Sequence, residues 1–292
     1  MRAEDCITNV MIAPDPQLVG LWESIITPSD VTDRLLHHAA LGLAVRGQLP
    51  FATTALHGLI LLHGPPGTGK TTLARSLPQQ LTSVVDGKVR LVEVNPHGLM
   101  SADHGRSQQL VSELLSDVVP GHADDGIPTV LVLDEVESMA VARNEASLAA
   151  NPVDVHRATD AVLSALDRLT NSHPHILTVA TSNFTSGLDA AFVSRADAAI
   201  EVPLPSLEAL IAILKDTLAG YGAAYPALND LAGDSQLRTV AEAMIGMDGR
   251  AARKLVIDAA ARRLESAADP NHLTINDLLV AAQARRAAGE LG

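Results

Sequence analysis

The sequence predicts an α/β fold in which a parallel sheet carries helices on both faces and a small all-helical region follows. A glycine-rich turn after the apolar run 59–62 leads directly into a helix start. Two further apolar runs, 130–133 and 176–180, end in polar side chains, as buried parallel strands commonly do. Beyond Pro205 only helical segments are predicted. The repeated order of strand and helix before that point indicates a parallel sheet.

We expect three parts along the chain. Residues 1–50 form a short N-terminal segment that ends in a linker helix, Val31 to Val45. Residues 51–205 form a large α/β domain, and residues 206–292 form a helical lid domain. The lid is predicted to contain four helices, at 206–218, 235–245, 250–266 and 275–288.

The glycine-rich turn has the composition of a phosphate-binding loop. It consists, in order, of Gly64, Pro65, Pro66, Gly67, Thr68, Gly69, Lys70 and Thr71, and Thr72 follows. The glycines allow the backbone N–H groups to point inward at phosphates, and the helix that follows adds its positive N-terminal end. Lys70 is expected to reach the β- and γ-phosphates of ATP, and Thr71 to ligate Mg²⁺.

A second element predicts hydrolysis of the bound nucleotide. The apolar run 130–133 ends in Asp134 and Glu135, so both carboxylates lie at the C-terminal edge of a buried strand. Open α/β sheets bind their ligands at this edge. We therefore expect Asp134 to complete the Mg²⁺ shell and Glu135 to polarise the attacking water.

Two more residues are candidates for the same site. The run 176–180 is followed by Asn183, which we expect to hold the attacking water. Arg195 lies beyond a short helical segment, and an arginine there could stabilise charge on a γ-phosphate, including that of a neighbouring subunit. The alternative is a surface arginine paired with Asp197. The third predicted lid helix has three basic residues near one face, Arg250, Arg253 and Lys254. They form either a solvated basic face or a contact with the phosphates of the nucleotide.

Composition excludes several function classes. The 292 residues are 47% hydrophobic and 19% charged, which indicates a globular chain. Lys and Arg number 21 against 34 Asp and Glu, a formal net charge of −13, so no nucleic-acid partner is expected. The single cysteine, Cys6, cannot form an intrachain disulfide, and the sequence contains neither a signal peptide nor a membrane-spanning run. We expect a cytoplasmic protein without a membrane partner.

The combined motifs resemble those of AAA+ ATPases. Within these they are similar to the pachytene-checkpoint ATPases that remodel HORMA-domain proteins, including the bacterial members. The segments that carry the resemblance are 21–24, 61–71, 133–138, 191–197 and 249–255. The narrower of them are Val136-Glu137-Ser138, Arg195-Ala196-Asp197, and the stretch Gly249 to Leu255.

The resemblance implies a mode of action. Arg250 or Arg253 would contact the γ-phosphate from the lid, and Arg195 would reach into the adjacent subunit of a hexameric ring. The ring would grip part of a HORMA-type protein substrate in its central pore and convert it between conformations. Catalytic residues would then be Glu135, Asn183, Arg195, Arg250 and Arg253.

One segment departs from the family pattern. The pore-facing loop follows the strand 89–94, and Ala102-Asp103-His104-Gly105 stands where the family has one or two aromatic residues. An aromatic ring grips an extended chain through a large contact area, which an aspartate cannot supply. The altered loop keeps open a nucleotide switch or scaffold that assembles with a partner without threading it. A further alternative, which shares Lys70, is a phosphate-loop kinase of small molecules. The kinase would not need Asn183, Arg195 or the lid.

Overall fold

The computed structural model describes residues 2–85, 87–95, 106–140, 152–184 and 187–289. The chain divides into two compact units. One comprises Met1–Gly64 and Lys70–Val202, and the other comprises Pro65–Gly69 and Pro203–Gly292.

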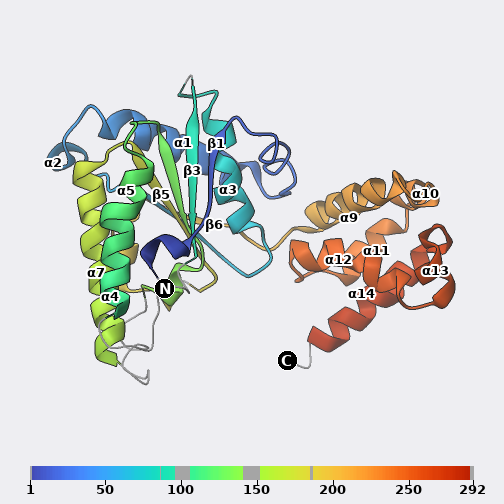
Figure 1. Ribbon diagram of the computed structural model, residues 1–292. Coiled ribbons are helices and arrows are strands. Elements are labelled where there is room, and N and C mark those ends of the chain that lie inside the picture. The colour runs from blue at the N-terminus through green and yellow to red at the C-terminus, as the bar shows by residue number, and fades with distance from the viewer. Residues whose placement is uncertain (1, 86, 96–105, 141–151, 185–186, 290–292) are drawn as a thin grey trace. The chain divides into compact units, whose positions relative to one another are not determined.

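A six-stranded sheet forms the centre of the first unit, with the strand order β1-β3-β4-β5-β2-β6 (Figure 1). The strands are β1 Ile7–Ala13, β2 Leu59–His63, β3 Val89–Val94, β4 Thr129–Leu133, β5 Ile176–Ser182 and β6 Ala198–Glu201. Strands β3, β4, β5, β2 and β6 are parallel, so the predicted fold class is confirmed. Their carboxyl ends meet at one edge, where ligands of such sheets bind.

Strand β1 corrects the expectation of a purely parallel sheet, because it pairs antiparallel with β3. It lies in the N-terminal segment, for which only a helix was predicted. Its side chains alternate between half-buried and exposed as far as Ala13, which is buried. The short helix η1, Ala3–Cys6, precedes it and buries Cys6 in the core.

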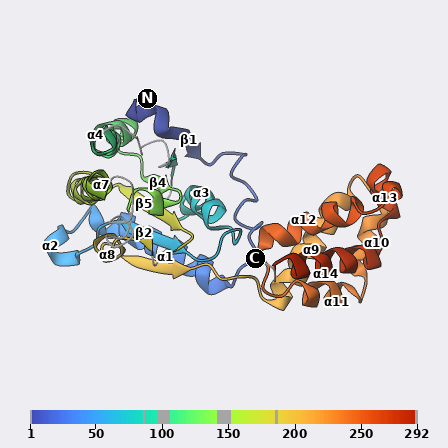
Figure 2. The ribbon, with the colours of Figure 1, turned by 90° about the horizontal axis from the view of Figure 1, so that it is seen from below.

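Helices cover both faces of the sheet. Successive strand residues point to opposite sides, so a strand made only of apolar residues presents an apolar surface on each face that must be buried. Leu59 and Leu61 of β2 belong to one core cluster, and Ile60 and Leu62 belong to the other. Helices α1 (Ser29–Arg46) and α3 (Lys70–Leu81) pack on the Ile60 face. The other face is covered by α4 Arg106–Glu113, the π-helix η3 Leu114–Val118, α5 Val119–His122 and α7 Pro152–Ser172. Figure 2 shows α4 and α7 on one side of β4 and β5 and α3 on the other.

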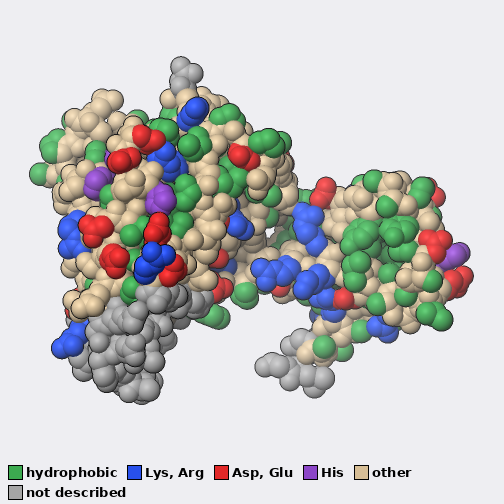
Figure 3. Space-filling model, viewed as in Figure 1, with side chains coloured by type: hydrophobic (Ala, Val, Ile, Leu, Met, Phe, Trp, Pro, Cys, Tyr) green, Lys and Arg blue, Asp and Glu red, His purple; other side chains and the backbone are tan. Residues whose placement is uncertain are grey.

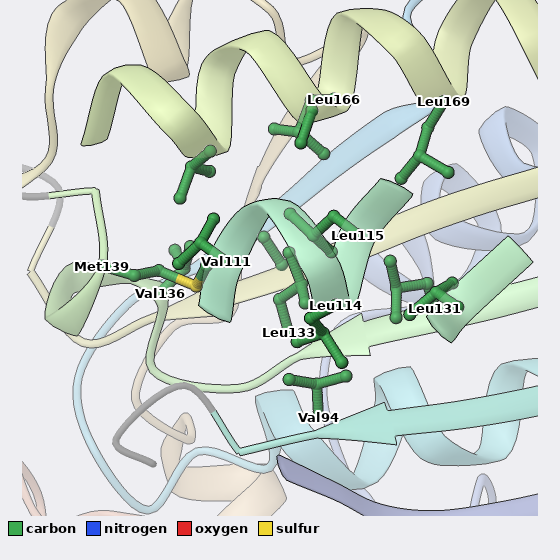
Figure 4. Packing of buried hydrophobic residues seen from close by; sticks show 14 of the residues in the cluster. Val94, Val111, Leu114, Leu115, Leu131, Leu133, Val136, Met139, Leu166 and Leu169 are labelled. Carbon is green, nitrogen blue, oxygen red and sulfur yellow. The ribbon is translucent and has the colours of Figure 1, made fainter. Parts of the chain in front are cut away.

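The remaining elements of this unit are short. They are α2 Phe51–Thr54, the 3-10 helix η4 Val136–Ser138 and α8 Ala190–Val193. Helix η4 follows β4 after Asp134 and Glu135, and its buried Val136 lies beside Met139 in the core cluster that also contains Val94 and Leu133 (Figure 4). This packing fixes the turn that carries the two acids after β4.

The second unit is helical, as predicted. It contains α9 Leu207–Gly222, α10 Ala227–Gly233, α11 Leu237–Ala243, α12 Gly249–Ala260, α13 Leu264–Ala268, η6 Pro270–His272 and α14 Ile275–Gly289. The single helix expected over 250–266 is two helices, because the Ser266 hydroxyl donates to the carbonyls of Ala260 and Arg263 and closes a turn between them. Helix α10 was not predicted; only seven residues long, it offers little periodicity. Within the part of the chain that the structure describes, no helix has the length and apolarity that a membrane span requires.

Candidate functional site

The predicted phosphate loop begins directly at the end of β2. Gly64 has φ 134°, and a Cβ atom there would lie 2.4 Å from the carbonyl oxygen of Val202. Only glycine fits this position, since the backbone conformation and the close strand both exclude a side chain. Gly67 and Gly69 also have positive φ, at 77° and 99°. The chain therefore makes a tight turn into α3, which begins at Lys70.

Lys70 is buried and held by oxygen atoms from two strand ends. Its Nζ donates to the Gly64 carbonyl at 2.8 Å and to Oδ1 of Asn183 at 2.9 Å. Only 5% of Lys70 is exposed, so its charge is largely removed from water. Lys70 and Asn183, predicted separately from the sequence, are thus in direct contact.

Asp134 joins three elements at the end of β4. Its Oδ1 accepts hydrogen bonds from Thr71 Oγ1 of α3 at 2.7 Å and from Thr181 Oγ1 of β5 at 2.5 Å. The hydroxyl and carboxylate oxygens of Thr71 and Asp134 are hard ligands of the kind that Mg²⁺ prefers. The two residues expected to hold the metal therefore lie together.

Glu135 has a left-handed backbone conformation, with φ 53° and ψ 52°. This conformation is uncommon for a residue other than glycine. The Glu135 N–H donates to Thr181 Oγ1 at 3.0 Å, so one threonine bonds both acids of the pair. The Asn183 amide approaches Glu135 Oε1 at 3.5 Å, which places the predicted water-holding residues side by side.

Other polar residues of this region were given no individual role from the sequence. Glu137 Oε1 accepts from the backbone N–H of Asn183 at 3.1 Å and so ties η4 to the end of β5. Glu93 of β3 is 5% exposed and forms a two-point ion pair with Arg75 of α3, in which Arg75 Nη2 lies 2.8 Å from Glu93 Oε2. This hydrogen-bonded carboxylate raises the pKa of Arg75. Glu93 carried a sequence signal as an acid within an apolar strand, and Glu137 lies in the Val136-Glu137-Ser138 motif of the family resemblance.

The ion pair borders a hollow next to the two acids. Its volume is about 380 Å³. It is lined by Thr8, Thr71, Arg75, Glu93, Val94, Asn95, Val132, Asp134 and Glu135. The hollow gives solvent access to the Asp134 and Glu135 side chains, which a water-dependent reaction requires.

Residues 65–69 of the loop make their contacts within the helical unit. The backbone N–H of Arg250 lies 3.3 Å from the Gly67 carbonyl. A Cβ atom on Gly67 would lie 2.2 Å from Oδ1 of Asp248, the carboxylate that caps α12 by accepting from the Ala251 N–H. Any side chain at position 67 would clash with Asp248, so this position requires glycine. The start of α12 therefore packs closely on the loop.

The two lid arginines differ in their surroundings. Arg253 Nη1 lies 3.0 Å from Asp216 Oδ2 of α9, whereas Arg250 is exposed in the first turn of α12. Figure 3 shows Lys and Arg side chains gathered on the face of this unit where α12 and α14 lie. A hollow of about 560 Å³ adjoins the loop here. Its lining residues are Pro65, Pro66, Leu204, Gly246, Met247, Asp248, Ala251, Arg285 and Ala288.

Arg195 lies just after α8, and its ion pair is not the one considered from the sequence. Its guanidinium bonds Asp167 of α7, with Nε to Oδ1 at 2.8 Å and Nη2 to Oδ2 at 2.9 Å. Asp197 instead accepts from the backbone N–H groups of His57, Gly58 and Leu59 and fixes the start of β2. The alternative pairing of Arg195 with Asp197 is therefore wrong.

The loop expected to face a pore, Ala102 to Gly105, lies outside the described residues. Strand β3 ends at Val94, as expected of the strand before that loop.

Comparison with known proteins identifies the family. The model of the ATPase family associated with various cellular activities (AAA) matches residues 60–204. CD-NTase-associated protein 6 of Pseudomonas aeruginosa is 46% identical over 266 residues, which are 91% of this chain and 87% of that protein. The chain belongs to the AAA+ ATPase family. The family resemblance seen in the motifs is thereby confirmed.

Two further matches extend the comparison. The pachytene checkpoint protein 2 homolog of Arabidopsis thaliana is 38% identical over 212 residues, which are 71% of this AAA+ chain and 45% of that protein. The chain thus spans about half the length of this relative. A structure of an E. coli MS115-1 HORMA:CdnC:Trip13 complex contains a chain with the same fold, with a TM-score of 0.75, 18% identity and 97% of both chains covered.

The hydroxyl of Thr181 gives a test of how the two acids are held. Thr181→Val keeps the side-chain volume but removes the donor to Asp134 and the acceptor of the Glu135 N–H. We expect a loss of about 1–3 kcal/mol in the free energy of unfolding, measured by chemical denaturation. Thr181→Ser retains the hydroxyl and is the matched control. Equal stability of Thr181→Val and the wild-type protein would show that these bonds do not hold the turn.

Proposed function

We propose that this AAA+ chain is a Mg²⁺-dependent ATPase that remodels a protein partner of HORMA-domain type. The observation that carries the ATPase part is the direct linkage of Lys70, Asn183 and Glu135 beside the contact of Thr71 with Asp134. These five residues come from the first turn of one helix and the ends of two adjacent strands. They supply a cation, a metal site and a polarising carboxylate at one edge of the sheet.

The loop and α3 would bind the phosphates. The N–H groups of residues 64–72 and the N-terminal end of α3 attract anions, and Lys70 would exchange its present oxygen partners for phosphate oxygens. Thr71 and Asp134 would hold Mg²⁺, which, when bound, neutralises charge on the β- and γ-phosphate oxygens. The apolar lining of the hollow beside Pro65 and Met247 suits the base of the nucleotide.

Glu135 and Asn183 would act on the attacking water. The Asn183 Nδ2 donor and a Glu135 oxygen lie 3.5 Å apart, so a water to one side of the pair can donate to the carboxylate and accept from the amide. The carboxylate then takes the proton as the water attacks the γ-phosphate. The fixed turn at Glu135 limits how far this carboxylate can move.

Arg250 is the better candidate for a γ-phosphate contact from the lid. Its backbone N–H reaches the loop carbonyl of Gly67, and its side chain is exposed. Arg253 forms an ion pair with Asp216 of α9, so its charge is already partly neutralised. Arg195 would act in trans, which requires a closed ring, and a hexamer is the state that the family resemblance implies.

The narrow motifs that resemble the HORMA-remodelling ATPases support the partner class. The E. coli structure that shares this fold is, by its title, a complex that includes a HORMA protein. A second candidate function is a non-threading scaffold or switch. The absence of an aromatic residue from Ala102-Asp103-His104-Gly105 favours it.

The first test separates binding from hydrolysis. Glu135→Gln should still bind ATP with Mg²⁺ but turn it over more slowly by a factor on the order of 100 or more, because the water loses its base. Lys70→Ala should lose nucleotide affinity instead. Equilibrium binding of a fluorescent ATP analogue and steady-state phosphate release measure the two effects. Near-normal turnover in Glu135→Gln would contradict the role given to Glu135.

The second test compares the lid arginines. Arg250→Ala should lower kcat about tenfold or more, since a charge-assisted contact with the transition state is lost. Arg253→Ala should leave kcat within about twofold and cost less than about 1 kcal/mol of stability, because its ion pair is partly exposed. The reverse order of the two kcat values would assign the phosphate contact to Arg253.

The third test concerns the partner. A purified HORMA-domain protein, labelled so that its closed and open forms differ in fluorescence, should convert between them only when ATP and the wild-type chain are both present. Asp103→Trp should accelerate conversion if the loop grips polypeptide, because an indole adds contact area. Nucleotide-dependent association without conversion, unchanged by Asp103→Trp, would favour the scaffold.

A further inference from the structure

The guanidinium of Arg195 is held along one edge by its own chain. Nε and Nη2 of Arg195 donate to the two carboxylate oxygens of Asp167, and Nη1 donates to the Ala191 carbonyl at 2.9 Å. A guanidinium has five N–H donors, so three are used and two remain. The Arg195 side chain is 22% exposed, which leaves a part of it accessible to a ligand.

The backbone that carries Arg195 is fixed as well. Helix α8 is capped by Asp189, whose Oδ1 accepts from the Ala191 N–H, and Phe192 is completely buried in the core. The N–H of Asp189 donates to the Ala140 carbonyl, which ties α8 to the segment after η4. A rigid support alone does not orient a long side chain, because an arginine side chain has many rotamers and loses conformational entropy when it is fixed. The bond to Asp167 supplies that orientation before any ligand arrives.

The geometry of the pair also suits a phosphate contact. The bonds to Asp167 and to the Ala191 carbonyl leave one N–H of Nη1 and one N–H of Nη2 available, so an incoming phosphate oxygen does not have to displace Asp167. The strong hydrogen bond from Arg195 lowers the pKa of the Asp167 carboxyl, so this group stays ionised at neutral pH. Asp167 follows Leu166 of α7, which is buried in the same core cluster as Phe192. The backbone segments that carry Asp167 and Arg195 are therefore both anchored in the same core cluster.

We propose that Asp167 is the positioning residue for Arg195 and sets the guanidinium edge that enters the active site of the neighbouring subunit. This inference rests on the proposed trans role of Arg195. It makes Asp167 a residue whose loss damages the neighbour's site and leaves the site of its own subunit intact.

Subunit mixing tests this directly. Asp167→Ala alone should lower kcat roughly 10- to 100-fold, as expected for a displaced catalytic group, with KM for ATP within about twofold of wild type. Glu135→Gln subunits cannot hydrolyse ATP but carry an intact Arg195–Asp167 pair. Mixed with Asp167→Ala subunits, they should raise the ATPase rate several-fold above the sum of the separate rates. Defects confined to the fold of the mutated subunit would not be rescued in this way.

Three controls complete the design. Asp167→Ala mixed with Arg195→Ala should show no gain, because both subunits lack a working arginine. Asp33→Asn removes one negative charge from an exposed position of α1 and should behave as wild type. If Asp167→Ala does not assemble, Asp167→Asn retains one acceptor oxygen and should give a smaller loss that Glu135→Gln subunits again reverse.

The outcomes separate the inference from its basis. If Arg195→Ala gains nothing from Glu135→Gln subunits, the trans role of Arg195 is wrong, and the inference falls with it. If Arg195→Ala is rescued but Asp167→Ala is not, or if Asp167→Ala hydrolyses ATP as fast as wild type or faster, only the positioning role is overturned. A faster rate would show that Asp167 restrains Arg195.

Discussion

The arrangement of the site depends on one oxygen atom, Oδ1 of Asp134. It accepts from Thr71 of α3 and Thr181 of β5, and its own residue directly follows β4. Hydrogen bonds to an ionised oxygen are among the stronger ones in proteins. This atom therefore holds the first turn of the phosphate-binding helix against two strand ends that are formed by segments far apart in the chain.

A second layer of bonds extends from this point. Thr181 also accepts from the Glu135 N–H, and Glu137 accepts from the Asn183 N–H. With the bond from Thr181 to Asp134, these are three links between the ends of β4 and β5 beyond their ladder. The strand ladder fixes the backbone as far as the edge of the sheet. The side-chain hydrogen bonds fix the next few residues, which include the candidate catalytic groups. The strands and the hydrogen bonds at their ends together keep the candidate catalytic groups within hydrogen-bonding distance of one another.

The sequence was sufficient for the groups whose chemistry requires particular residues at particular spacing. The glycines of the loop, Lys70, and the acids after β4 are of this kind, since backbone shape and ligand chemistry determine them locally. The partner of Arg195 was not predictable in that way. Asp197, two residues away, is used by backbone N–H groups at the start of β2, while Asp167 is 28 residues distant and reaches Arg195 only through the packing of α7. Strand β1 was missed because an edge strand at the beginning of a chain shows only a short alternation.

The left-handed conformation of Glu135 has a consequence for the history of the sequence. A residue with a Cβ atom in this region of φ and ψ costs the folded state on the order of 1 kcal/mol, which glycine or asparagine would largely recover. Random substitution and selection for stability alone would therefore favour replacing this glutamate. The chain nevertheless has a glutamate at this exposed position, so the turn gives up some stability and gains a carboxylate next to Thr181 and Asn183.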